Sequence, residues 1–178
     1  MVRLGRRPDD QVMTSTDHID RPHSAERAGP LLICYDGSEH AELAIRHAAG
    51  LLAAKDALVV TVWQPTAFLG GFAWSGEASR VDLAELDRAV AEDGGRVAVE
   101  GVRIAEEAGL AAEPMAVEAN GPVWKTVKET ADRNDAAVIV MGSRGLTGLR
   151  SMLLGSVSSA VVHHADRPVL VVHSPSTG

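Results

Sequence analysis

Short apolar runs alternate with segments of helical periodicity along most of the chain, and this alternation limits the fold more than any other feature. Five runs are short and apolar, as strands covered on both faces are: 30–36, 57–65, 110–119, 136–141 and 168–173. Four segments repeat apolar residues at helical spacing: 38–56, 81–109, 121–134 and 156–165. Strands that alternate with helices predict an α/β protein with a single, mostly parallel sheet. Pro114 cannot donate to a ladder, so the third strand is predicted at an edge.

The remaining segments are predicted to lie outside the sheet. Residues 1–29 interleave arginines with acids, lack apolar periodicity and contain no apolar core of a signal peptide, which predicts a disordered tail. Residues 66–80 hold three glycines and predict a long loop. Residues 175–178 form a short C-terminal tail. One domain is therefore expected over residues 30–174.

Composition excludes several classes of function. The 24 acidic and 17 basic residues give a formal net charge of −7, which argues against nucleic acid as a partner. No stretch approaches the roughly 18 consecutive apolar residues of a membrane span. The single cysteine, Cys34, excludes an internal disulfide and fits a reducing compartment, so a cytoplasmic location is expected.

A glycine-rich stretch, MGSRGLTGLRSMLLGS (141–156), directly follows the fourth strand. Gly142 and Gly145 carry no side chain, so the backbone there can approach a ligand closely. Gly155 and Ser156 open a helix whose unpaired N–H groups favour an anion. Open parallel sheets bind ligands beyond the carboxyl ends of their strands, where this stretch begins. It therefore predicts a phosphate cradle, and the alternative is a plain connecting turn.

The phosphate cradle differs from two common nucleotide motifs. It contains neither G-x-x-x-x-G-K-[ST] nor G-x-G-x-x-G, so the P-loop and the dinucleotide fingerprint do not apply. Its spacing is G-x-x-G, nine residues, then G-S, after a strand that ends in Met-Gly-Ser. Together with "YDGSE", "TVWQP" and "DRPVLVVH", this spacing resembles the universal stress protein family over residues 30–173. The resemblance implies a Rossmann-like open sheet of five strands, in the order 3-2-1-4-5, with helices on both faces.

The resemblance also implies an ATP site. Asp36 would border the ribose and phosphates and can hold Mg²⁺ through water, and the backbone near Val62 would meet the adenine. Arg144 is expected to approach a phosphate, with Arg150 a weaker candidate. The ribose and phosphates would contact five further residues: Gly142, Gly145, Gly155, Ser156 and Val157. The last strand, 168–173, would pair two copies in a homodimer.

Three readings of individual residues accompany this expectation. Asp36 has an alternative role as an acid that caps the next helix. Cys34 and Tyr35 precede it where many nucleotide binders carry a smaller pair. Cys34 is read as a small buried residue rather than a redox sensor, and a Tyr35 ring directed at the site would crowd the adenine.

Three classes of function follow from these readings. The favoured one is an ATP-binding regulatory or stress-response module, in which nucleotide occupancy changes conformation or partner affinity. The alternatives are a slow ATP hydrolase and a nucleotide-free dimeric scaffold. No catalytic residue is predicted, because nothing in the cradle supplies a general base beside Asp36. No metal site is predicted either, because the histidines lack ligand spacing.

Overall fold

The structure, a computed structural model, describes residues 29–66, 83–146 and 154–173. Four predictions fall wholly or almost wholly outside these ranges: the tails at 1–29 and 175–178, the loop at 66–80, and the role of Arg150. No helix within the described ranges is both long enough and apolar enough to cross a membrane.

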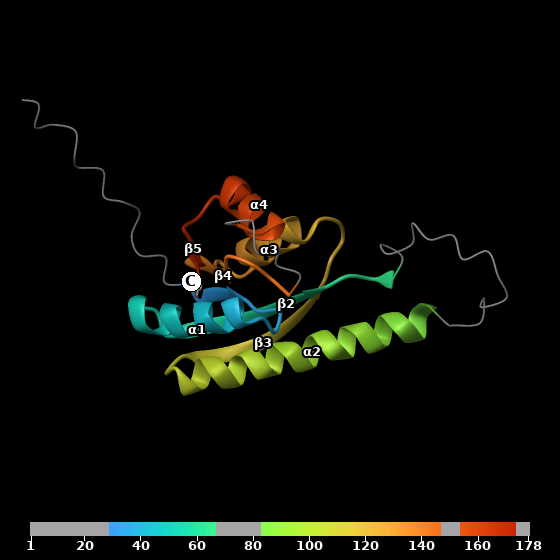
Figure 1. The fold of residues 1–178 in the computed structure, drawn as a ribbon, viewed down its shortest axis with the longest axis horizontal. Helices are drawn as coiled ribbons and strands as arrows, with labels where there is room; N and C mark the ends of the chain where they lie inside the picture. Colours follow the sequence, from blue (N-terminus) through green and yellow to red (C-terminus); the bar gives the residue numbers. More distant parts are fainter. Residues whose placement is uncertain (1–28, 67–82, 147–153, 174–178) are drawn as a thin grey trace, which may run out of the picture.

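Five strands form one sheet in the order β3-β2-β1-β4-β5, and every neighbouring pair is parallel (Figure 1). The strands are β1 (Leu31–Cys34), β2 (Asp56–Trp63), β3 (Ala111–Glu118), β4 (Val138–Gly142) and β5 (Val169–Val172). The helices are α1 (Glu39–Leu51), α2 (Leu83–Glu107), α3 (Val123–Arg133) and α4 (Ser156–His164). The predicted sheet order is confirmed, and so is the edge position of the strand that contains Pro114.

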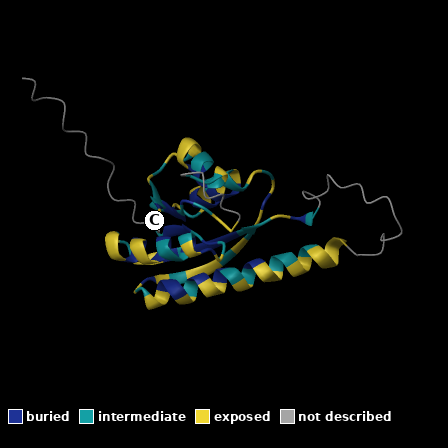
Figure 2. Cartoon of the chain, viewed as in Figure 1, coloured by how far each residue is buried: buried dark blue, intermediate teal, exposed yellow. Residues whose placement is uncertain are grey.

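Two helical layers cover the sheet, because alternate residues of each strand point to opposite faces. Leu31 and Ile33 of β1 belong to a core cluster with α1 and α2. Leu32 belongs to a second cluster with α3 and α4. Figure 2 shows the buried residues concentrated in the sheet and on the helix faces turned toward it. The buried side chains are mostly aliphatic, as the low aromatic content requires.

Helix α1 begins where the sequence predicts and ends earlier. The Oγ atom of Ser38 accepts a hydrogen bond from the Ala41 N–H at 3.2 Å, so Ser38 is the N-cap. The helical pattern extends to residue 56, whereas α1 ends at Leu51. The carbonyl of Lys55 accepts a hydrogen bond from Ala111 at 2.7 Å, so pairing with β3 overrides the helix propensity of this segment.

Candidate functional site

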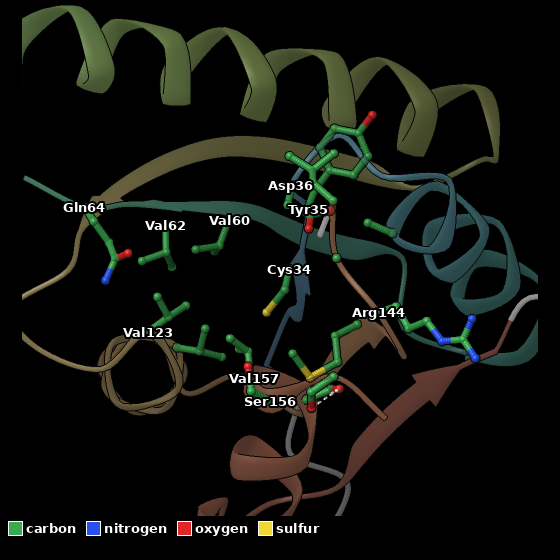
Figure 3. A pocket seen from close by; sticks show the side chains of 18 residues that line it. Cys34, Tyr35, Asp36, Val60, Val62, Gln64, Val123, Arg144, Ser156 and Val157 are labelled. Atoms are coloured by element: carbon green, nitrogen blue, oxygen red, sulfur yellow. Dashed lines mark hydrogen bonds between the residues drawn. The ribbon is translucent and has the colours of Figure 1, made fainter. Parts of the chain in front are cut away.

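A cavity of about 670 Å³ opens at the carboxyl ends of β1, β2 and β4, between the first turns of α3 and α4 (Figure 3). Strand β1 lies between β2 and β4 and is the shortest of the three, so the gap beyond its last residue, Cys34, is left open. After β1, the next two strands, β2 and β3, are added on one side of it, and the last two, β4 and β5, are added on the other side. The cavity therefore lies at the topological switch point, where open α/β sheets bind ligands.

Two glycines allow the loop after β4 to approach its neighbours. A Cβ atom on Gly142 would lie 2.7 Å from the carbonyl carbon of His40, which is backbone and cannot move aside. A Cβ atom on Gly145 would lie 2.5 Å from Oδ2 of Asp36. Both glycines are therefore required by close packing against α1 and Asp36, and the approach of this backbone to a ligand stays a prediction.

The far end of the glycine-rich stretch returns to the same place. The N–H of Gly155 donates to the carbonyl oxygen of Ser143 at 2.7 Å. The buried Oγ of Ser158 lies 3.0 Å from the carbonyl oxygens of both Ser143 and Gly155. These contacts hold Gly142–Gly145 beside the start of α4, as the cradle hypothesis requires.

The N-terminus of α4 faces the cavity. Its N-cap is Gly155, which has no side chain to accept from the first-turn N–H groups. Ser156, Val157 and Ser158 all line the cavity, and their N–H groups find no acceptor among the described residues. Unpaired N–H groups and the positive end of the helix dipole together favour an anion here.

Asp36 both stabilises the turn before α1 and lines the cavity. Its Oδ1 accepts a hydrogen bond from the Ser38 N–H at 3.1 Å, which fixes the turn before α1. Ser38 itself caps the helix, so the capping role considered for Asp36 belongs to its neighbour. The other oxygen, Oδ2, faces Gly145 at the cavity wall. Asp36 is the only carboxylate among the described lining residues.

The main chain of Val62 turns toward the open gap. The carbonyl of Trp63 accepts from Ala119 beyond β3, and the carbonyl of Val60 accepts from Tyr35 on the β1 side. Main-chain groups of a strand point alternately to its two neighbours, so Val62 shares the direction of Val60. The register between β1 and β2 ends with the pairing of Cys34 and Val60. The N–H and C=O of Val62 therefore lie past the end of β1.

The carbonyl of Tyr35, one residue past the end of β1, is the group nearest in register to the Val62 N–H. It accepts instead from the Thr61 hydroxyl at 2.9 Å. Within the part of the chain that the structure describes, no hydrogen bond joins the main chain of Val62 to β1. One donor and one acceptor are thus available at the cavity edge.

One end of the cavity is apolar, and sequence reasoning identified little of it. Its lining includes two valines of β2, two valines of α3, and three residues from β1, β4 and α4: Val60, Val62, Val123, Val127, Cys34, Met141 and Val157. Gln64 lies at the rim of this end, beyond Val62 (Figure 3). Residues two apart along a strand share a face, so Gln64 lies on the face of Val60 and Val62. This spacing is the sequence signal that could have identified Gln64.

Cys34 and Tyr35 point to opposite faces of the sheet. The sulfur of Cys34 projects into the cavity (Figure 3). Cys34 is half-buried rather than buried. Desolvation of its thiol, with a contribution from the Asp36 carboxylate, raises the pKa of that thiol to about 12, which agrees with an inert residue rather than a redox sensor. The Tyr35 ring lies on the other face, in the core formed with α1 and α2, where it is 6% exposed. The ring is therefore not directed at the cavity, and the condition for crowding a ligand is not met.

Two predictions remain, one for Arg144 and one for the absence of a metal site. Arg144 contributes to the lining, and in Figure 3 its guanidinium extends away from Ser156 and Val157. The described residues hold no cluster of three or more His, Cys, Asp or Glu side chains with which to bind a metal ion.

Comparison with known proteins agrees with this architecture. The universal stress protein family model matches residues 28–173. A universal stress protein of Methanocaldococcus jannaschii is 33% identical over 147 residues, 82% of this chain and 82% of its own. One from Thermus aquaticus is 34% identical over 144 residues, 80% of this chain and 96% of its own.

A solved structure of a universal stress protein in complex with cAMP has 25% sequence identity and a TM-score of 0.52, and the match covers 82% of this chain and 96% of that chain. The sheet order, the glycine cradle and a family match that spans the whole sheet lead to one assignment. This chain belongs to the universal stress protein family.

Proposed function

We propose that this protein binds an adenine nucleotide, with ATP as the expected ligand, and acts as a nucleotide-dependent regulatory module in a stress response. One observation carries the proposal: the unpaired N–H groups of α4 and the free main chain of Val62 open into the same cavity. An anion site and a donor–acceptor pair on an apolar wall match the two chemically different halves of a nucleotide.

The phosphates would occupy the glycine-lined end. Gly142 and Gly145 line the cavity and carry no side chain, so a ligand could come close to the backbone there. The N–H groups of Ser156 and Val157 and the Ser156 hydroxyl supply donors for phosphate oxygens. Arg144 is the cation among the described lining residues, and it would reach a phosphate by changing rotamer.

Asp36 would hold the middle of the ligand. A carboxylate at this point can accept from a ribose hydroxyl, or can hold Mg²⁺ through water while the phosphates supply the remaining oxygen ligands. Mg²⁺ needs few protein ligands when phosphates are present. A single carboxylate in the lining is therefore compatible with ATP bound together with Mg²⁺.

The base would lie at the apolar end. The side chains of Val62 and Val123 face each other across the cavity in Figure 3 and would contact the two faces of a planar ring. The N–H and C=O of Val62 can then meet an acceptor and a donor on the base edge. The cAMP complex of a relative with 25% identity supports an adenine nucleotide as the ligand class.

Regulation is favoured over turnover because the lining is poor in proton-transfer groups. A general base must lie within hydrogen-bond reach of the attacking water. Asp36 is the one carboxylate among the described lining residues, and its Oδ1 already accepts from Ser38. No histidine belongs to that described lining. Slow ATP hydrolysis would therefore have to depend on Asp36 alone.

Calorimetric titration of the nucleotide-stripped protein tests the proposal. ATP with Mg²⁺ is the ligand, AMP and GTP are the comparison ligands, and phosphate release is followed in parallel. Micromolar ATP binding without phosphate release is expected. Binding with steady release would favour the hydrolase. Absence of binding to a folded protein would contradict the proposal and favour the nucleotide-free scaffold.

We also propose that two copies pair through β5. This strand is hydrogen-bonded only to β4 and lies at the edge of the sheet. Val169, Leu170 and Val171 are only half-buried there. An exposed apolar edge strand invites pairing with a second copy. Light scattering should give a dimer for the native chain, and replacing Val171 by lysine should shift it toward the monomer.

A further inference from the structure

We propose that Gln64 is a specificity residue of this site, and that its side-chain amide reads the 6-amino group of a bound adenine. This inference rests on the proposed function, because it concerns the base end of the same cavity. It extends that function from adenine nucleotides as a class to one side chain that recognises the base.

The position of Gln64 follows from the alternation along β2. Val60 and Val62 face the α3 side of the sheet and line the cavity. Trp63 faces the other side of the sheet, next to Gly94 of α2. A Cβ atom added at Gly94 would lie 3.5 Å from the Trp63 side chain. Gln64 therefore continues the row of Val60 and Val62. In Figure 3 its amide points across the cavity mouth in the direction of Val123.

The chemistry around Gln64 gives this amide a distinct role. The other described side chains at that end are aliphatic or carry sulfur, so none offers a strong acceptor to a base. The polar side chains Asp36 and Ser156 lie away from Gln64, toward the glycine-lined end. Gln64 is exposed at the cavity rim, so its amide is accessible to a ligand. A few placed polar groups in an apolar pocket are what orient a ligand.

A glutamine amide suits the edge of adenine. Its carbonyl oxygen accepts from the exocyclic amino group, while its NH₂ group can donate to a neighbouring ring nitrogen. The main chain of Val62, two residues earlier, supplies a donor and an acceptor at the same end of the cavity. Side chain and main chain can thus contact adjacent positions of one base edge.

The test combines a change in the protein with a change in the ligand. Wild type, Gln64→Leu and Gln64→Glu are titrated with ATP, with purine riboside triphosphate, which lacks the 6-amino group, and with inosine triphosphate, which carries an oxygen there. Asn120→Ala removes an exposed amide at the same end of the sheet but outside the cavity lining, and is the matched control. Circular dichroism checks that each variant is folded.

Wild type should bind ATP more tightly than purine riboside triphosphate. In Gln64→Leu this preference should shrink by about fivefold or more, because the acceptor for the amino group is gone. Gln64→Glu should keep ATP and weaken inosine triphosphate, since a carboxylate accepts from an amino group and repels an oxygen. Asn120→Ala should behave as wild type.

Two contrary results are distinguishable. If wild type binds ATP and the preference over purine riboside triphosphate is unchanged in Gln64→Leu, the role of Gln64 is wrong while nucleotide binding stands. If wild type binds none of the three nucleotides, the proposed function fails and the inference fails with it. Should Gln64→Leu not fold, the Gln64→Glu comparison of ATP with inosine triphosphate decides the matter alone.

Discussion

Gly145 and Asp36 are in direct contact, since a Cβ atom at position 145 would lie 2.5 Å from the Oδ2 of the carboxylate. Gly145→Ala should therefore push the Asp36 side chain away and strain its hydrogen bond with the Ser38 N–H. We expect affinity for ATP with Mg²⁺ to fall by about tenfold or more, because about 1.4 kcal/mol corresponds to each factor of ten. Calorimetric titration measures the change.

Gly50→Ala is the control for this variant. Gly50 lies in α1, and an added Cβ atom there meets nothing within 4 Å. It should leave ATP affinity unchanged and add helix propensity. Equal affinities for Gly145→Ala and Gly50→Ala would show that the contact between Gly145 and Asp36 does not matter for binding.

The sheet could be predicted from sequence because each of its elements carries a local signal. A continuous apolar run such as 136–141 reports burial on both faces, and the pattern around Ala44 and Ala48 reports one buried helix face. The strand order came from family resemblance, since alternation alone does not say which strand lies at an edge. Only Pro114 gave a local indication of that.

The glycine-lined end of the cavity was largely predictable, and the apolar end was not. Gly142, Gly145 and Gly155 stand out in sequence because backbone approach requires glycine. Gln64 and Val123 are ordinary residues whose importance depends on which strand and helix ends meet. The direction of Tyr35 was left open at the sequence level for a related reason, because the face to which a strand residue points has to be counted from its neighbours.

Gly101 is required by Tyr35 on the opposite face of the sheet. A Cβ atom at position 101 would lie 2.7 Å from Cδ1 of Tyr35 and 2.7 Å from Cγ1 of Val59. Gly101→Ala should therefore lower the free energy of unfolding by about 1–3 kcal/mol through overpacking. Urea denaturation measures it. Gly95→Ala, in the same helix with nothing within 4 Å, should be neutral or stabilising; equal destabilisation of both variants would contradict the packing argument.

Arg167 joins α3 to the beginning of β4 and should contribute strongly to stability. Its side chain is 4% exposed, and its Nη1 donates to the carbonyl oxygens of Ala131 at 3.0 Å and Ala136 at 2.6 Å. Its Nη2 pairs with the carboxylate of Asp132. Arg167→Met would remove all three of these bonds; Ala131 would keep the bond from the Ala136 N–H and Asp132 its pair with Lys128, whereas the Ala136 carbonyl would lose this donor. The free energy of unfolding should fall by about 2–4 kcal/mol.

The control for Arg167 is an ion pair in solvent. Arg96 is 77% exposed and pairs with Asp93 at 2.8 Å, so Arg96→Met should change stability by less than about 0.5 kcal/mol. The urea midpoints of the two variants are compared, after checking that the free energy of unfolding depends on urea concentration with the same slope in both. Similar midpoints for both would mean that the buried hydrogen bonds of Arg167 add little beyond an exposed pair.

Cys34 should resist alkylation until strongly alkaline pH, because desolvation in the cavity wall raises its pKa to about 12. The thiolate is the reactive form, so the rate with iodoacetamide should still rise about tenfold per pH unit between roughly pH 8 and 11. The urea-unfolded chain is the control, and its rate should level off near the ordinary value of 9.0. Since this is the only cysteine, the measured rate belongs to it alone.

The raised pKa of Cys34 also makes the free energy of unfolding depend on pH. Above pH 9.0 the unfolded chain releases the Cys34 proton while the native protein keeps it up to about pH 12. The unfolded state then binds fewer protons, so the free energy of unfolding should fall as the pH rises through this window. Cys34→Val should reduce the slope of that fall. A native alkylation rate that levels off near pH 9, or a slope unchanged in Cys34→Val, would mean that the cavity wall leaves the thiol as accessible to water as in the unfolded chain.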